Sequence, residues 1–245
     1  MARLFASASS QRFDKDVGIV TEAPFTMMCW FMALDVTSAF VLMWLGDKDA
    51  AADFFTLSAA GHVAGDPVRA TARNGGTSFA AATTTGYTAN VWYHAAGAWA
   101  SSASRAAYIN GGSKGTETTN VVPAGVDRFR IGGNGDSSPD DYFNGRLAAC
   151  KMWRAALTQE EVQMEMRQYL PVRLNGFIGL WPFTNGYVGN DSTGLHMLAS
   201  TGTGTPTPIE GPPIPWGYMS RHRHDSVAAI VASPSWSSLT LLGVQ

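Results

Sequence analysis

Two apolar runs near the start of the chain carry hydrophobic residues at nearly every position. The first covers Phe25–Leu34 and the second covers Ala39–Leu45. A strand with one face in water alternates apolar and polar residues, so both faces of these two strands are predicted to be covered. One face would meet an opposing sheet. The other would meet a helix, the C-terminal segment or another protein chain.

Shorter apolar runs separated by glycine-rich turns predict further strands. Asn74-Gly75-Gly76 and Asn110-Gly111-Gly112 are turn signals, because glycine reaches positive φ without steric cost. Residues 114–120 are threonine-rich and are expected to be an exposed run. The predicted strands cover residues 4–13 (interrupted at 7–10), 53–58, 68–73, 78–84, 91–99, 104–109, 128–134, 142–157, 177–183 and 195–200.

One helix is predicted, over about 158–169. Thr158 with Glu161 forms a capping box, in which two side chains satisfy the free N–H groups of the first turn. Pro171 ends the helix because proline lacks the backbone donor. The apolar stripe at i, i+4 and i+7 consists of Val162, Met166 and Tyr169.

The composition favours a β-rich protein with covered surfaces. Charged residues make up 15% of the 245 residues, below the roughly 25% of an average soluble domain. A net charge of −2 excludes the basic stripe that nucleic-acid binding needs. No run reaches the roughly 20 apolar residues of a membrane helix. Because Met1–Ser7 has no apolar core, we expect no signal peptide and synthesis in a cytoplasm.

Cys29 and Cys150 both lie in apolar strand-like runs. A disulfide between them is one alternative and two free buried thiols are the other. We favour free thiols, because a buried cysteine behaves as a small hydrophobic residue.

The composition shifts at Thr201, which suggests one domain over residues 1–202 and a proline-rich extended arm over 203–245. Thr201–Pro215 contains five prolines and is expected to run extended over a surface. His222 and His224 have no further zinc ligands nearby, so this segment is interpreted as a contact with other subunits. The predicted partner-binding residues are Trp216, Tyr218, Arg221, Arg223 and Trp236.

Four motifs in order resemble the laminin-G-like branch of the concanavalin A-like lectin/glucanase superfamily. They are Phe25–Trp30, Trp92–His94, Tyr108–Gly111, and Phe143–Leu147 followed by Trp153 and Ala156–Glu161. The resemblance implies an all-β fold: a jelly-roll sandwich of two antiparallel sheets, here with one short helix and an extended C-terminal arm.

The low charge, the single domain and the proline-rich Glu210–Pro215 also resemble laminin-G-like proteins encoded by tailed bacteriophages. That resemblance implies a virion protein made in the host cytoplasm.

No catalytic residues are predicted. Glucanases of this fold carry their carboxylates at alternate positions of one strand, and this chain has no such run. The helix acids Glu160, Glu161 and Glu165 are interpreted as capping and solvent-facing residues. We therefore expect no enzyme activity.

The acidic loop between the last two motif strands offers oxygen ligands for calcium, which is the one cofactor considered. Many relatives bind calcium near this loop with help from an Asp-Gly in the first strand, whose place here is taken by Ala6-Ser7. The alternative is a solvated turn. The candidate ligands are Asn134, Asp136, Asp140 and Asp141.

Glycan binding would use exposed aromatic rings that stack on sugars. Tryptophans 44, 92, 99, 153 and 181 lie in apolar strands and are interpreted as core residues. The candidates in predicted loops are Tyr87, Tyr142 and Tyr187.

Two functions remain. The first is a non-enzymatic structural surface protein of a tailed-phage virion, such as a capsid decoration protein. It would be a homo-oligomer attached to neighbouring virion subunits through its arm and apolar surface. The alternative is a carbohydrate-binding adhesin module on a tail fibre or cell surface, with a surface glycan as partner. Neither function involves nucleic acid or membrane.

Overall fold

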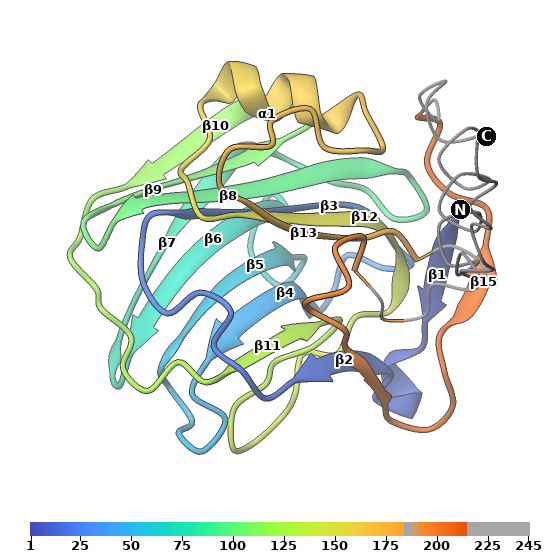
Figure 1. The fold of residues 1–245 in the computed structure, drawn as a ribbon, viewed down its shortest axis with the longest axis horizontal. Helices are drawn as coiled ribbons and strands as arrows, with labels where there is room; N and C mark the ends of the chain where they lie inside the picture. The colour runs from blue at the N-terminus through green and yellow to red at the C-terminus, as the bar shows by residue number, and fades with distance from the viewer. Residues whose placement is uncertain (184–188, 190, 215–245) are drawn as a thin grey trace, which may run out of the picture.

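The computed structural model describes residues 1–183, 189 and 191–214. In these residues two antiparallel sheets face each other around one hydrophobic core (Figure 1). This confirms the two-sheet sandwich that the sequence predicts.

The first sheet has the order β10 (Gly112–Glu117), β9 (Ser104–Ile109), β8 (Tyr93–Ser101), β3 (Phe25–Ala33), β12 (Gly145–Trp153), β1 (Ala2–Phe5), β15 (Thr207–Ile209), and β13 (Phe177–Trp181) pairs with β12. The second has the order β14 (Ala199–Thr201), β2 (Arg12–Lys15), β11 (Arg128–Ile131), β4 (Ala39–Gly46), β5 (Phe54–Ala60), β6 (Pro67–Asn74), β7 (Thr77–Gly86). The helical elements are the 3-10 turn η1 (Ser7–Ser9) and the helix α1 (Gln159–Met166).

Most strands lie within a few residues of their predicted bounds, and β10 is the exception. The threonine-rich run 114–120 was expected only to be exposed, yet residues 112–117, which overlap it, form a strand that pairs with β9. Asn110 and Gly111 both adopt positive φ, which is the geometry of a tight hairpin turn. The turn returns the chain alongside β9, so a polar run becomes an edge strand.

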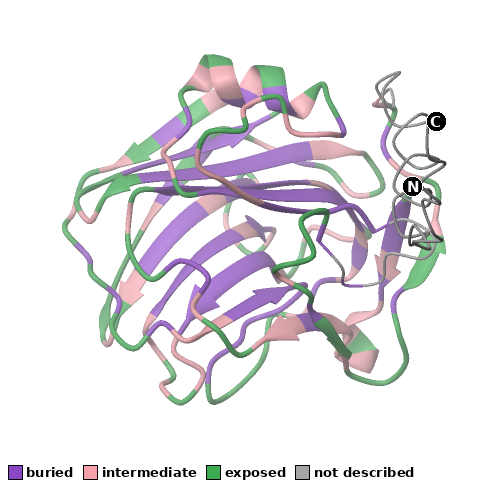
Figure 2. Cartoon of the chain, viewed as in Figure 1, coloured by how far each residue is buried: buried purple, intermediate pink, exposed green. Residues whose placement is uncertain are grey.

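The core lies between the two sheets, where Figure 2 shows the strands largely buried and the exposed residues concentrated in loops and on the helix. Cys29 on β3 and Cys150 on β12 are both buried and both free. Burial and the neighbouring Cys29 sulfur raise the pKa of the Cys150 thiol well above its usual value. The free-thiol alternative is therefore confirmed.

The outer face of the first sheet is covered by α1, as predicted for the apolar run of β3 (Figure 1). Met28 of β3 packs with Trp153, Leu157 and Val162 in a cluster separate from the main core. The capping box is present: the Glu161 N–H donates to Thr158 Oγ1 at 3.3 Å, and the Thr158 N–H donates to Glu161 Oε2 at 2.9 Å.

Glu165 was expected to face solvent, and this prediction is wrong. Its side chain is fully buried and pairs with Lys151 of β12, at 3.0 Å between Nζ and Oε2. The same Nζ donates to the Glu165 carbonyl at 2.9 Å and the Gln168 carbonyl at 2.7 Å. Carbonyls at the end of a helix have no partner within it, so Lys151 caps α1 from the sheet below. Sequence spacing within the helix cannot reveal a partner on a strand.

The outer face of β4 is covered by the loop 132–141 of the same chain. Trp44 is fully buried on this face with Val41 and Phe54. A Cβ atom at Gly135 would lie 2.6 Å from the Trp44 ring, so only glycine lets the backbone lie so close. For β4 the expectation of a helix, the C-terminal segment or another chain is wrong.

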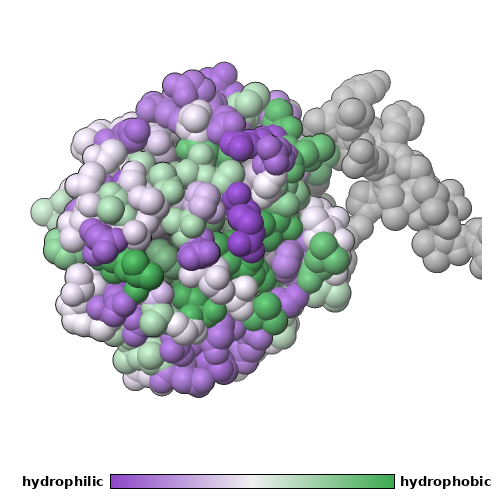
Figure 3. Space-filling model, turned by 60° about the vertical axis from the view of Figure 1, so that its left-hand side comes forward, coloured by the Kyte–Doolittle hydropathy of each residue, from purple (hydrophilic) through white to green (hydrophobic). Residues whose placement is uncertain are grey.

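Figure 3 shows strongly hydrophilic residues on one face as separate groups among neutral and apolar ones, in keeping with the low charged fraction. Among the described residues, no helix combines the length and apolar character needed to cross a membrane.

The Lys151–Glu165 pair yields a stability prediction. Lys151→Met leaves the Glu165 carboxylate buried without its cation, so we expect the free energy of unfolding to fall by about 3–5 kcal/mol. Urea unfolding measures this. The double variant Lys151→Met, Glu165→Gln should recover part of the loss, since its amide is uncharged and still accepts from the Val172 N–H. As a control, Lys48→Met removes a partly exposed cation and should change the free energy of unfolding far less. Equal losses at both lysines would contradict the prediction.

His94 of β8 yields a pH prediction. Burial, and secondarily the Lys151 charge, lower the pKa of His94 to about 3. An unfolded histidine titrates near 6.5, so between these values the unfolded state binds more protons and stability falls as the pH is lowered. From about pH 7 to about pH 5 this residue should cost about 2 kcal/mol of unfolding free energy. The neutral variant His94→Gln should show a pH dependence shallower by that amount. Parallel curves for the two proteins would count against a neutral buried His94.

Candidate binding groove

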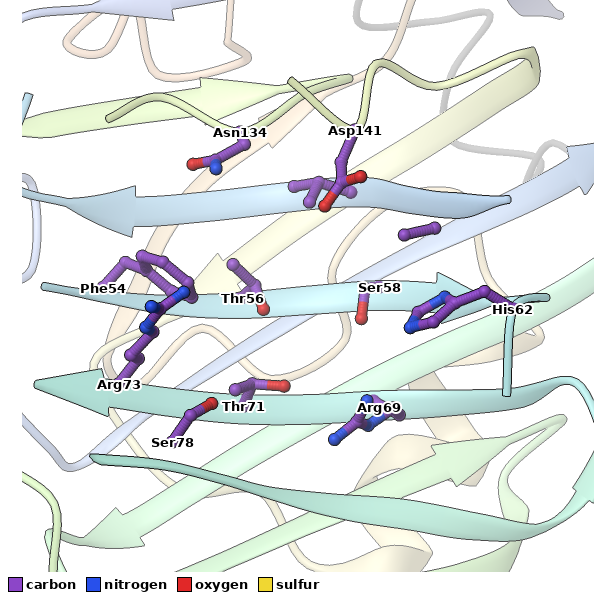
Figure 4. Close-up of a pocket in the computed structure, with 12 residues that line it drawn as sticks. Phe54, Thr56, Ser58, His62, Arg69, Thr71, Arg73, Ser78, Asn134 and Asp141 are labelled. Atoms are coloured by element: carbon purple, nitrogen blue, oxygen red, sulfur yellow. The ribbon is translucent and has the colours of Figure 1, made fainter. Parts of the chain in front are cut away.

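A groove of about 230 Å³ opens on the outer face of the second sheet, beside the loop 132–141 (Figure 4). It lies over β4, β5 and β6. Its lining is Ala39, Val41, Phe54, Thr56, Ser58, His62, Arg69, Thr71, Arg73, Ser78, Asn134 and Asp141.

Strand alternation places the floor residues. On β5, Phe55, Leu57 and Ala59 point into the core, so the residues between them point outward. The register of β5 against β6 then sets polar groups opposite each other. The cross-strand pairs of the floor are Phe54 with Arg73, Thr56 with Thr71, and Ser58 with Arg69.

The two arginines of the floor differ in their partners. The Arg73 guanidinium lies 5.7 Å from the centre of the Phe54 ring, and its Nε donates to the Gly75 carbonyl at 3.2 Å. Arg69 makes neither a side-chain hydrogen bond nor an ion pair with any residue that the structure describes. Burial lowers the pKa of Arg69, but an arginine stays charged at any ordinary pH.

The hydroxyl groups of the floor are also available. Those of Thr56, Thr71, Ser58 and Ser78 make no hydrogen bond within the described part of the chain. A hydroxyl donates one hydrogen bond and accepts others, so this row offers both functions to a ligand.

The acidic loop forms one wall of the groove. The Arg130 guanidinium holds it by donating from Nη1 to the Asn134 carbonyl. The Asn134 amide donates to Asp136 Oδ2 at 3.0 Å and to Asp140 Oδ1 at 2.8 Å. The Asp141 carbonyl accepts from the Val41 N–H at 3.0 Å, which ties the end of the loop to β4.

Asp141 is the one carboxylate among the described residues that line the groove. Loss of hydration at its carboxylate, and then the charges of Asp140 and Asp136, raise the pKa of Asp141 to about 6. The residue itself is exposed, so water remains in contact with the side chain. It can change its charge close to neutral pH.

The predicted calcium ligands are adjacent, but an amide already bridges two of them. Asn134 turns its N–H groups, not its oxygen, toward the Asp136 and Asp140 carboxylates. Calcium would require oxygen atoms to converge there. The calcium site stays a prediction.

Elsewhere in the described residues, three carboxylates converge at Asp47, Asp49 and Asp127. The Lys48 ammonium contacts two of these groups, Asp49 and Asp127. Its hydrogen bonds to Asp127 and Asp49 raise the pKa of Lys48. Lysine thus supplies the positive charge within this cluster.

The predicted glycan-binding tyrosines do not line the groove. Tyr87 was taken for a loop residue open to solvent, but it is 2% exposed and packs edge-on against Phe31. Tyr142 is half-buried with the Arg12 guanidinium 5.5 Å from its ring centre. Tyr187 lies outside the described residues, and so do the partner-binding candidates Trp216, Tyr218, Arg221, Arg223 and Trp236.

The tryptophan prediction holds for the strand residues. Trp44, Trp99, Trp153 and Trp181 are fully buried, whereas Trp92 is half-buried just before β8. No residue of the groove floor is among the site residues predicted from the sequence. Its signal is the alternation Val68-Arg69-Ala70-Thr71-Ala72-Arg73, which points two arginines and a threonine out of one strand.

A family model described as the concanavalin A-like lectin/glucanases superfamily matches residues 7–163. The chain belongs to this superfamily. Members share the sandwich of two antiparallel sheets seen here, and the match runs from η1 into α1. No curated protein matches the sequence.

Solved structures of the superfamily's fold share little sequence with this chain. A candidate carbohydrate-binding protein from Bacteroides ovatus matches with a TM-score of 0.60 at 18% identity, over 87% of this chain and 61% of its own. The chain thus spans less than two thirds of that protein.

Two smaller structures also share the fold. The CBM40 of the Ruminococcus gnavus IT-sialidase, bound to α2,3-sialyllactose, matches with a TM-score of 0.52 at 16% identity, over 60% of this chain and 83% of its own. Domain 4 of an extracellular GH43 arabinanase from Geobacillus stearothermophilus, in complex with arabinotriose, matches with 0.51 at 20%, over 62% and 70%. At these identities the likeness concerns the fold.

Calcium can be tested directly on the acidic loop. Because the Asn134 amide already bridges Asp136 and Asp140, we expect millimolar calcium to leave the Tm unchanged relative to a chelator. Asn134→Ala should lower the Tm by a few degrees, since the hydrogen bonds of its amide to the Asp136 and Asp140 carboxylates are lost. Thermal unfolding followed by circular dichroism measures both. A calcium-dependent rise in Tm that Asp136→Asn abolishes would establish the predicted site instead.

Proposed function

We propose that this chain is a non-catalytic carbohydrate-binding module that holds a saccharide in the groove over β5 and β6. The observation that carries the proposal is the cross-strand ladder of its floor. Thr56 and Thr71 face each other with free hydroxyls, and Arg69 adds free N–H donors beside them.

The chemistry of the groove suits a sugar. A saccharide presents closely spaced hydroxyl groups that both donate and accept hydrogen bonds, above faces formed by C–H groups. The floor offers hydroxyls and guanidinium donors together with the apolar side chains of Val41 and Phe54. A ligand that replaces ordered water gains affinity when it reproduces the hydrogen bonds of that water, and a polyhydroxyl ligand does so.

The solved structures that share this fold support the same function. One is named as a candidate carbohydrate-binding protein, and two others hold sialyllactose and arabinotriose. These ligands belong to those proteins, and their relevance here depends on the groove of this chain.

The lining of the groove supports binding rather than hydrolysis. A retaining glycosidase needs two carboxylates about 5–5.5 Å apart, and an inverting one needs two that are somewhat farther apart. Among the described lining residues Asp141 alone carries a carboxylate, so an acid–base pair is not assembled there.

The role of a virion surface protein stays a prediction, as do virion localisation and assembly with other subunits. The prediction of a virion surface protein depends partly on the apolar strands, both faces of which were expected to be covered. In the structure α1 and the loop 132–141 of the same chain cover those faces. Its remaining support is the arm, whose partner-binding candidates lie outside the described residues. We therefore prefer the carbohydrate-binding function.

The proposal predicts binding on a glycan array and a specific loss in a floor variant. Thr56→Val with Thr71→Val keeps the shape of both side chains but removes two hydroxyls. With each lost hydrogen bond worth about 0.5–1.5 kcal/mol, affinity for the best array ligand should fall about tenfold. Isothermal titration calorimetry measures the loss.

Thr116→Val is the matched control, because Thr116 is exposed on β10 in the other sheet. It should bind like the wild type. The groove assignment fails if both variants bind equally well, and the proposed function fails if the wild type binds nothing on the array.

A further inference from the structure

We propose that the saccharide is acidic and that its carboxylate is bound by the Arg69 guanidinium with the neighbouring Ser58 hydroxyl. This inference rests on the proposed function and names the class of ligand for the same groove.

The arginines on the outer face of the second sheet differ in how their charges are compensated. Arg12 and Arg130 pair with Asp14 of β2, and Arg128 pairs with Asp16 just after that strand. None of the ion pairs among the described residues involves Arg69. Its floor neighbour across β5 is Ser58, which is neutral. The groove therefore presents a partly buried cation that lacks an anion.

A half-buried guanidinium in this position favours an anionic partner. Removing a cation from water is costly unless the charge is compensated, and a carboxylate compensates it through charge-assisted hydrogen bonds. A planar carboxylate also matches the parallel N–H groups of arginine. The Ser58 hydroxyl can donate a further bond, since it has no partner among the described residues.

Arg69 rather than Arg73 is assigned to the carboxylate. The two residues are four positions apart on β6, which separates their Cα atoms by about 13 Å at roughly 3.3 Å per residue. They cannot clamp one carboxylate together. Arg73 already lies over the Phe54 ring and donates to Gly75, whereas Arg69 stands free beside Ser58 and His62 (Figure 4). Arg73 would instead lie near a second sugar unit.

The test compares a uronic- or sialic-acid oligosaccharide with the methyl ester of the same molecule by calorimetry. The ester keeps the shape and removes the charge. We expect the wild type to bind the acid at least about tenfold more tightly, because the contact is charge-assisted. Arg69→Met should abolish the difference. Arg167→Met, at the exposed C-cap of α1, is the control and should preserve it.

A second variant leaves Arg69 in place. Ser58→Ala removes the hydroxyl opposite Arg69 and should weaken binding of the acid several-fold while changing binding of the ester less. If acid and ester bind equally to the wild type, the acidic-ligand inference is overturned while the proposed function stands. If neither compound nor any array glycan binds, both fail. A preference for the acid that survives Arg69→Met would also overturn the assignment.

Discussion

Two central strands of this sandwich are apolar on both faces, and each needs a cover on its outer side. For β3 the cover is α1, and for β4 it is the loop 132–141. Each cover is held in place by a cationic side chain of the sheet beneath it. Lys151 reaches the Glu165 carbonyl of α1 and the Gln168 carbonyl just beyond the helix, and Arg130 reaches the Asn134 carbonyl of the loop. Each cation also has a carboxylate partner, Glu165 or Asp14. The layers outside the sandwich therefore depend on buried charge as well as on apolar contact.

The groove is a consequence of where the second cover ends. The loop covers Trp44 on β4, with Gly135 against the Trp44 ring. The loop residues Asn134 and Asp141 line the groove, and they lie at the edge of the area that the loop covers. Beyond them the outward positions of β5 and β6 form the floor of the groove, and the sequence there changes from apolar to polar. Thr56 and Thr71, which are 5% and 8% exposed, occupy the middle of this floor. The same loop thus completes the fold on one side and forms a wall of the candidate site on the other.

Much of the fold was predictable because its signals are local. The capping box at Thr158, the turn at Asn110-Gly111 and the continuous apolar runs of β3 and β4 each depend on residues close in sequence. What could not be predicted depends on partners far apart in the chain. Glu165 looks like a solvent-facing helix residue until β12 supplies Lys151, and Tyr87 looks like a loop aromatic until it packs on Phe31. The floor of the groove is an intermediate case. The alternation of polar and apolar residues along β6 can be recognised in the sequence. The register of β6 against β5, which places polar residues opposite each other, cannot.

The outer face of the second sheet divides into two halves by charge pairing. On β11 and β2, register places Arg130 directly opposite Asp14, and Arg128 reaches Asp16, so the charges there are compensated within the fold. On β6 and β5, the same kind of register places Arg69 opposite a serine. The two halves of this sheet therefore differ in function. One half pairs its arginines with aspartates. The other half leaves an arginine beside the groove without an ion pair among the described residues. The first half holds the loop in place. The second retains a cation, free hydroxyls and a nearby carboxylate with a raised pKa, and these are the groups from which recognition of a charged sugar can be built.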